Sequence, residues 1–258
     1  MNYKKAQNEY ADLRTYTHPL TDPDNEAGDK EAEEQTDLQS DDPESRETGS
    51  SAEESSGPKD KKGGNKKIRY KAPITVDHEA LEKMNPDYVG WLYIEDTDIS
   101  YPVMQGPDDD YYLHRTFEGN YLYAGSLFMN SSADRNFSDP CTFVYGHNMK
   151  DTSMFGRLSL FTDHGLYTRD SVFWILTKQA DYCYRIFSIH VCNEDSDTYT
   201  LFSGPSEQVS EYISKMISLS AVDAPDIEYD DKARIVTLST CLDAEGPERY
   251  VVQGIRIN

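Results

Sequence analysis

From position 89 to the carboxyl end, short apolar segments alternate with polar stretches. The apolar segments are rich in β-branched and aromatic residues, which favour strands, and turn-forming runs such as E-D-T-D and K-Q-A-D bound several of them. Eight such segments occur, at 89–94, 99–104, 125–129, 141–147, 171–177, 182–191, 233–241 and 249–257. The pattern predicts a mainly β fold, and a barrel or closed sandwich suits eight short strands.

Apolar residues at helical spacing predict two short helices before the strands. The first places Tyr3, Gln7, Tyr10 and Leu13 on one side, and it needs a partner because an isolated helix of this length is unstable in water. The second covers 78–84, where Asp77 can cap the amino end and the Asn-Pro pair at 85–86 ends it.

Two further helices are predicted between strands. Segment 154–161, M-F-G-R-L-S-L-F, follows possible caps at 151–153, and its apolar residues share one face: Met154, Phe155, Leu158 and Phe161. Segment 206–219 has apolar residues at i, i+3, i+4, i+7 and i+8 from Val209, which predicts an amphipathic helix that lies on a sheet.

The segment between the first helix and the strands has a different composition. Thr21 to Asp60 carries 15 acidic and 3 basic residues, and Leu38 is its only large aliphatic residue. Such a stretch cannot bury enough apolar surface to offset its ordering entropy. We therefore predict a short helix at 1–17, a disordered acidic linker at 18–71 that ends in a basic stretch, and a folded catalytic domain at 72–258.

Charge and cysteine usage narrow the classes of function. The acidic segment accounts for 12 of the 22 net negative charges, so nucleic acid is not an expected partner. No apolar run reaches the length of a membrane span, and the first residues lack a signal-peptide core. The four cysteines have no CxxC spacing, so we expect free thiols among them, no metal site and no cofactor.

Three residues at strand ends suggest thiol chemistry. Cys241 ends the run A-R-I-V-T-L-S-T-C, His147 ends C-T-F-V-Y-G-H, and Arg249 opens the last strand. Acyl transfer by a thiol needs a nucleophile, a proton-exchanging group such as histidine, and a donor for the developing oxyanion. From the residues alone, Cys241 also fits a buried, inert thiol, and Arg249 fits a surface salt bridge.

The remaining histidines and cysteines fit structural or surface roles. The histidines lie in loop-like contexts, on a short helix or within a strand: His18, His78, His114, His164 and His190. Cys183 and Cys192 are nine residues apart in one strand and so point to opposite faces. We expect both of these, and Cys141, to be buried and inert.

Several separated motifs resemble those of class B sortases. T-L-S-T-C at 237–241 with a downstream Arg249 resembles the sortase signature, and V-Y-G-H-N-M-K-D-T-S-M-F-G at 144–156 resembles the histidine segment of class B. N-P-D-Y-V-G-W-L at 85–92 and Y-P-V-M-Q at 101–105 match in kind and order. The resemblance extends from about Val76 to the carboxyl end.

This resemblance implies a fold and a set of site residues. The fold is an eight-stranded sortase-type β-barrel with short N-terminal helices and a helix in the insertion between strands six and seven, here 193–231, which forms a wall of the groove for the sorting signal. Cys241 is the implied nucleophile, His147 the acid and base, and Arg249 the donor to the substrate backbone or oxyanion. Groove-lining roles fall to Leu238 and Thr240.

The implied activity is that of a cysteine transpeptidase. Such an enzyme cleaves a C-terminal sorting signal after threonine, forms a thioacyl-enzyme and transfers the protein to an amine of peptidoglycan or of a pilin. The resemblance places it at the outer face of a Gram-positive membrane, anchored by a segment outside this sequence. Two other readings are a cysteine endopeptidase with water as acceptor and a non-catalytic barrel that binds envelope polymer or partner proteins.

Overall fold

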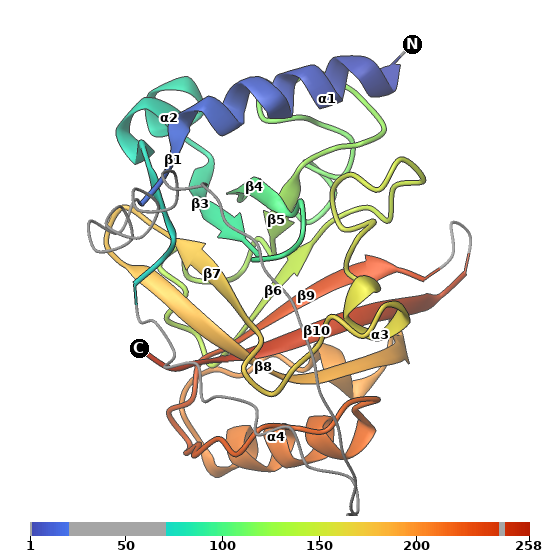
Figure 1. Ribbon diagram of the computed structural model, residues 1–258. Coiled ribbons are helices and arrows are strands. Elements are labelled where there is room, and N and C mark those ends of the chain that lie inside the picture. The colour runs from blue at the N-terminus through green and yellow to red at the C-terminus, as the bar shows by residue number, and fades with distance from the viewer. Residues whose placement is uncertain (1, 21–70, 243–245) are drawn as a thin grey trace, which may run out of the picture. The chain divides into compact units, whose positions relative to one another are not determined.

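The computed structural model describes residues 2–20, 71–242 and 246–258 (Figure 1). Most of the predicted acidic linker, 18–71, lies outside these residues. In the described ranges, no helix combines the length and the apolar character needed to cross a bilayer.

Eight strands close into a barrel in the order β10-β8-β7-β3-β4-β5-β6-β9. Their bounds are β3 Tyr88–Tyr93, β4 Ser100–Met104, β5 Leu127–Met129, β6 Cys141–Tyr145, β7 Val172–Leu176, β8 Asp181–Asn193, β9 Ile235–Cys241 and β10 Glu248–Arg256. The β4–β5 and β6–β9 pairs are parallel, and every other neighbouring pair, including β9–β10, which closes the barrel, is antiparallel. The predicted mainly β class, and a strand within each of the eight segments, are confirmed.

The barrel buries residues on both faces of part of its sheet. Along β9, Val236 and Leu238 belong to the barrel core, whereas Ile235 belongs to a second apolar cluster outside it. Because side chains alternate along a strand, odd-numbered residues of β9 face that second cluster.

Helix α4, Glu207–Leu219, covers this outer face (Figure 1). Its apolar side packs on Phe143 and Ile235, and the buried residues it contributes are Val209, Tyr212, Ile213 and Met216. The predicted helix at 206–219 is therefore confirmed. It belongs to the insertion between β8 and β9, together with the 3-10 turn η2 Asp197–Tyr199.

The predicted helix at 154–161 is wrong over most of its length. Only Leu160–Asp163 (α3) is helical, and the residues before it form turns. Met154 has φ of 52° and forms an isolated bridge with Asn148, which is incompatible with a right-handed helix. The four apolar residues are nevertheless 3% exposed or less. Their spacing therefore reflects that they are buried and does not indicate a helix.

Helix α1, Asn2–Leu13, and helix α2, His78–Met84, occupy the predicted positions. The Asp77 side chain accepts from Ala80 N at 3.0 Å, as predicted for an N-cap. Ala6, Tyr10 and Leu13 of α1 are buried in the main core cluster, and the Tyr10 hydroxyl donates to Gly125 O. These contacts supply the partner that a short helix needs.

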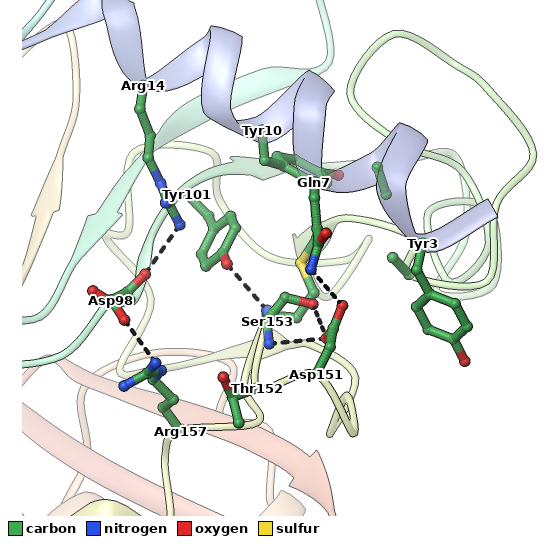
Figure 2. A pocket seen from close by; sticks show the side chains of 13 residues that line it. Tyr3, Gln7, Tyr10, Arg14, Asp98, Tyr101, Asp151, Thr152, Ser153 and Arg157 are labelled. Carbon is green, nitrogen blue, oxygen red and sulfur yellow. Dashed lines mark hydrogen bonds and ion pairs between the residues drawn. The ribbon is translucent and has the colours of Figure 1, made fainter. Parts of the chain in front are cut away.

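A cavity of about 360 Å³ lies between α1 and the loop 151–157 (Figure 2). Gln7 Nε2 donates to Asp151 Oδ2 at 3.0 Å across it, and Arg157 pairs with Asp98 at 2.9 Å. Helix α1 therefore contacts the loop that follows His147.

Two short strands were not predicted. β1 Thr17–Pro19, which follows the 3-10 turn η1 Arg14–Tyr16, pairs antiparallel with β2 Ile74–Val76. Leu20 N also donates to Pro73 O at 2.8 Å. Residues 17–20 and 73–76, which flank the segment outside the described residues, therefore lie side by side.

Candidate active site

The carboxyl ends of β6 and β9 bring His147 and Cys241 together. The two strands are parallel neighbours, with Tyr145 opposite Ser239, and Gly146 N donates to Ser239 O at 3.2 Å. His147 and Cys241 are each two residues beyond this pair, on the same edge of the sheet. Alternation along β9 points Cys241 to the face that carries Ser239, and Asn148, directly after His147, bonds Cys241 O at 3.1 Å.

Arg249 lies across β9 from the other side. In the antiparallel β9–β10 pair its Cα is the partner of the Cys241 Cα. Directly opposed side chains lie on the same face of a sheet. Cys241 is thus flanked by Arg249 on β10 and by the segment after β6 that carries His147.

The insertion between β8 and β9 covers the face of β9 that carries Ser239, two residues before Cys241. Tyr199, at the end of η2, forms a hydrogen bond of 2.7 Å between its hydroxyl and Ser239 Oγ. Cys241 itself is only half-buried. The thiol therefore sits where the covered face opens to solvent.

His147 is held by the loop that precedes β5. Its Nε2 lies 2.8 Å from Leu113 O, and a carbonyl only accepts, so Nε2 carries the hydrogen and Nδ1 is left for proton exchange. Burial is the main cause that lowers the pKa of His147, with a smaller contribution from the neighbouring His114, while the Leu113 contact opposes it. The environment favours the neutral imidazole.

Arg249 makes contacts at both terminal nitrogens. Its Nη1 donates to Gly246 O at 2.9 Å and to Glu248 O at 3.1 Å, and its Nη2 forms an ion pair with Glu194. The Nε–H and the second Nη2–H have no partner among the described residues. The guanidinium is thus oriented while two donors remain available.

Asn148 is a site residue that the sequence analysis did not single out. Its Nδ2 donates to Cys241 O at 3.1 Å and to Leu242 O at 3.2 Å. It connects the residue after His147 to the backbone of the cysteine. Its place directly after the histidine in V-Y-G-H-N was the signal that could have identified it.

Comparison with known proteins decides the family. The family model described as "Sortase domain" matches residues 92–257. Sortase B of Listeria monocytogenes is 35% identical over 176 residues, which cover 67% of this chain and 71% of that protein. The chain belongs to the sortase family, in class B.

Solved structures agree with this sortase assignment. Clostridium perfringens sortase B superposes with a TM-score of 0.65 at 29% identity, covering 70% of this chain and 99% of that one. A Staphylococcus aureus sortase B–substrate complex gives 0.64 at 29% identity, with 70% and 84% covered. Sortases are cysteine transpeptidases of the Gram-positive cell envelope, and this sortase is an enzyme of that type.

The position of Leu238 in the sortase barrel argues against a groove-lining role. Its side chain is 0% exposed and packs in the barrel core, and Thr240 is 4% exposed. Because side chains alternate along β9, both residues face away from the side of Cys241. Both predicted groove contacts are therefore incompatible with this face, and the alternation was already visible in the sequence.

The other thiols of the sortase differ in burial. Burial raises the pKa of Cys141 and of Cys183 to about 12, which fits inert core thiols. Cys192 is half-buried, contrary to the expectation that it is buried. All four cysteines are free, and residues 2–20, 71–242 and 246–258 contain no cluster of three potential metal ligands.

Proposed function

We propose that Cys241 is the nucleophile of this sortase, His147 its general acid and base, and Arg249 the donor to the substrate backbone or oxyanion. The observation that carries the proposal is the strand register. Tyr145 pairs with Ser239 and Arg249 with Cys241, and His147 follows Tyr145 by two residues, which supports a shared site for the three residues. A nucleophile, a proton carrier and an oriented cation are the groups that acyl transfer requires.

In the first step, neutral His147 takes the proton of the Cys241 thiol, and the resulting thiolate attacks the carbonyl carbon of the threonine residue in a sorting signal. The tetrahedral oxyanion is stabilised by the free N–H groups of Arg249. The peptide C–N bond then breaks, and protonated His147 gives its proton to the leaving nitrogen. The product is a thioester between Cys241 and the shortened surface protein.

In the second step, an acceptor amine attacks the thioester carbonyl. Neutral His147 takes a proton from that nitrogen, the C–S bond breaks, and Cys241 leaves as the thiolate. We propose a peptidoglycan amine as the natural acceptor, at the outer face of the membrane. Transfer to a pilin lysine, hydrolysis by water and binding without catalysis are the other outcomes that an assay can reveal.

A peptide assay tests these steps. Labelled pentapeptides of the N-P-x-T-x and L-P-x-T-G kinds are incubated with the enzyme, with and without oligoglycine, and products are identified by mass spectrometry. We expect an amine-linked product and a thioester adduct on Cys241. Hydrolysis alone with every amine tested would contradict transfer.

Cysteine substitutions test the nucleophile. We expect Cys241→Ala to lose cleavage and adduct formation while it keeps its fold. Cys192→Ala is the matched control, because that half-buried thiol lies opposite Arg249 on β8 and so tests whether a second thiol near the site contributes. Cleavage by folded Cys241→Ala at the wild-type rate would exclude the assignment.

A further inference from the structure

The rings of Tyr123, His114 and His147 lie close together with small angles between their planes. The Tyr123 ring stacks on His147 with centroids 5.0 Å apart and planes at 19°. His114 lies 5.5 Å from His147 at 14° and 5.6 Å from Tyr123 at 27°. Offset, near-parallel rings at these separations attract one another beyond their contact area.

The loop that supplies these rings is itself fixed. Leu122 N donates to His114 O at 2.9 Å, and Arg115 forms an isolated bridge with Tyr121. Gly125 has φ of 55°, and a Cβ there would lie 2.2 Å from Leu113 O, so the loop closes tightly on the carbonyl that binds His147. Tyr10 of α1 bonds the same glycine from outside.

A single hydrogen bond does not fix an imidazole. The torsion that turns a histidine ring is broad, so the ring can swing about its bond to Leu113 O. A flat ring stacked on the imidazole restricts that swing. Loss of orientation at a reacting group costs rate without costing much binding.

The exposure of Tyr123 indicates why it is there. Its side chain is 54% exposed, which is unusual for a ring whose role is core packing. Since it buries little surface, its removal should change the free energy of unfolding only slightly. Its stacking contacts in the described residues are with His147 and His114.

We propose that Tyr123, backed by His114, is a positioning residue that holds His147 in the orientation needed for proton transfer. The stack keeps hydrogen on Nε2, toward Leu113, and leaves Nδ1 to exchange the proton. The proposal rests on the role proposed above for His147. His147→Asn tests that role separately, since full activity in this variant would remove the role itself.

Variants at Tyr123 separate positioning from substrate binding. We expect Tyr123→Ala to lower kcat for peptide cleavage on the order of ten-fold, with KM changed less than about two-fold. Tyr123→Phe keeps the ring and should retain near wild-type kcat. An unchanged kcat in Tyr123→Ala, or a raised KM alone, would overturn the proposal.

Tyr121→Ala is the matched control. Tyr121 is 73% exposed and contacts His114 at 5.9 Å, but no stacking with His147 is found for it in the described residues. We expect near wild-type kcat and KM. A fall in kcat as large as that of Tyr123→Ala would show that any exposed tyrosine of this loop matters, and would overturn the specific role.

His114 provides a second pair of variants. Its Nδ1 is buried and has no hydrogen-bond partner among the described residues, so a phenyl ring should replace it without loss of a bond. We expect His114→Phe to keep kcat and His114→Ala to lower it. Equal activity of the two would show that the His114 ring does not support the stack.

Nitrogen-15 spectra give a readout that a purely structural role would not move. In the wild type we expect His147 to show a protonated Nε2 at neutral pH. In Tyr123→Ala we expect a mixture of tautomers, with an unchanged thermal midpoint. A wild-type tautomer signal together with reduced kcat would contradict the proposed mechanism of positioning.

Discussion

At the residue scale, Arg249 combines structural contacts with the catalytic role proposed for it. Its guanidinium reaches Gly246 O, Glu248 O and the Glu194 carboxylate from two nitrogens. The surface salt bridge considered from the sequence is present. It orients the planar group and leaves two N–H donors, so it is compatible with the catalytic reading.

We expect Arg249→Lys to lower kcat/KM by about two orders of magnitude or more, because an ammonium cannot supply the forked donors to an oxyanion. The measurement is steady-state cleavage of a sorting-signal peptide. Arg169→Lys is the control, since Arg169 is 58% exposed and pairs only loosely with Asp223 at 3.9 Å. Near wild-type turnover in Arg249→Lys would leave Arg249 with a structural role.

At the element scale, His190 joins β8 to the insertion. Ser188 Oγ donates to Met216 O at 2.8 Å, so it accepts from His190 Nδ1, and His190 Nε2 lies 3.0 Å from Thr198 Oγ1. Both ring nitrogens of neutral His190 are therefore satisfied. Burial lowers the pKa of His190 to about 4.

This pKa predicts a pH-dependent stability. The unfolded state, with a histidine pKa of about 6.5, binds more protons than the folded state between about pH 6.5 and about pH 4. The contribution of His190 is thus complete above pH 6.5 and is lost as pH falls, by as much as about 3 kcal/mol. Denaturant unfolding at several pH values measures it.

His190→Gln isolates this contribution from that of the carboxylates. We expect its free energy of unfolding to fall less steeply between pH 6.5 and 4.5 than that of the wild type. Identical slopes would show that His190 does not titrate in this window. The substitution retains polar atoms near Ser188 and Thr198, which limits its cost at pH 7.5.

At the element scale, apolar runs predicted the strands correctly, but apolar spacing predicted the helix at 154–161 wrongly. The runs of β-branched and aromatic residues identified all eight barrel strands, because several strands are buried on both faces and so are apolar along most of their length. The segment 154–161 looked helical, yet backbone turns with positive φ at Thr152 and Met154 bury the same side chains. Burial constrains which residues are apolar, but several backbone shapes satisfy one apolar spacing.

At the scale of the whole molecule, the pairing of β1 with β2 brings together the residues on either side of the acidic segment. A linker between α1 and the barrel was predicted, yet Thr17 pairs with Val76 and Leu20 with Pro73. The two ends of that segment therefore meet. Helix α1 docks on the domain through contacts that precede the segment.

We expect replacement of residues 21–70 by a four-residue glycine-rich turn to preserve activity. Closing a shorter loop costs less entropy, so the free energy of unfolding should rise by about 2 kcal/mol. Denaturant melts and peptide cleavage are the measurements. A glycine-serine segment of the original length is the control and should match the wild type.

Loss of cleavage in both replacements would instead show that the acidic residues take part in turnover. Loss in the short turn alone would show that the β1–β2 pair cannot form with a tight connection. Either result would contradict the expectation that the ends are held independently of what joins them.

By itself the sequence determined the strands, the helix at 206–219 and the family. The strands follow from local runs of β-branched and aromatic residues, the helix from apolar residues at helical spacing, and the family from short motifs around His147 and Cys241. Cys241, His147 and Arg249 all lie in or just after these motifs. Their chemistry is carried by residue type at strand ends, which a sequence displays directly.

Only the tertiary structure decided which strands are neighbours. The parallel pairing of β6 with β9 joins residues 94 positions apart, since Tyr145 faces Ser239, and alternation indicates a face but never a partner. The contacts that Leu113, His114 and Tyr123 make with His147 likewise come from another loop. Contacts between distant segments depend on the closure of the whole barrel, so no local pattern contains them.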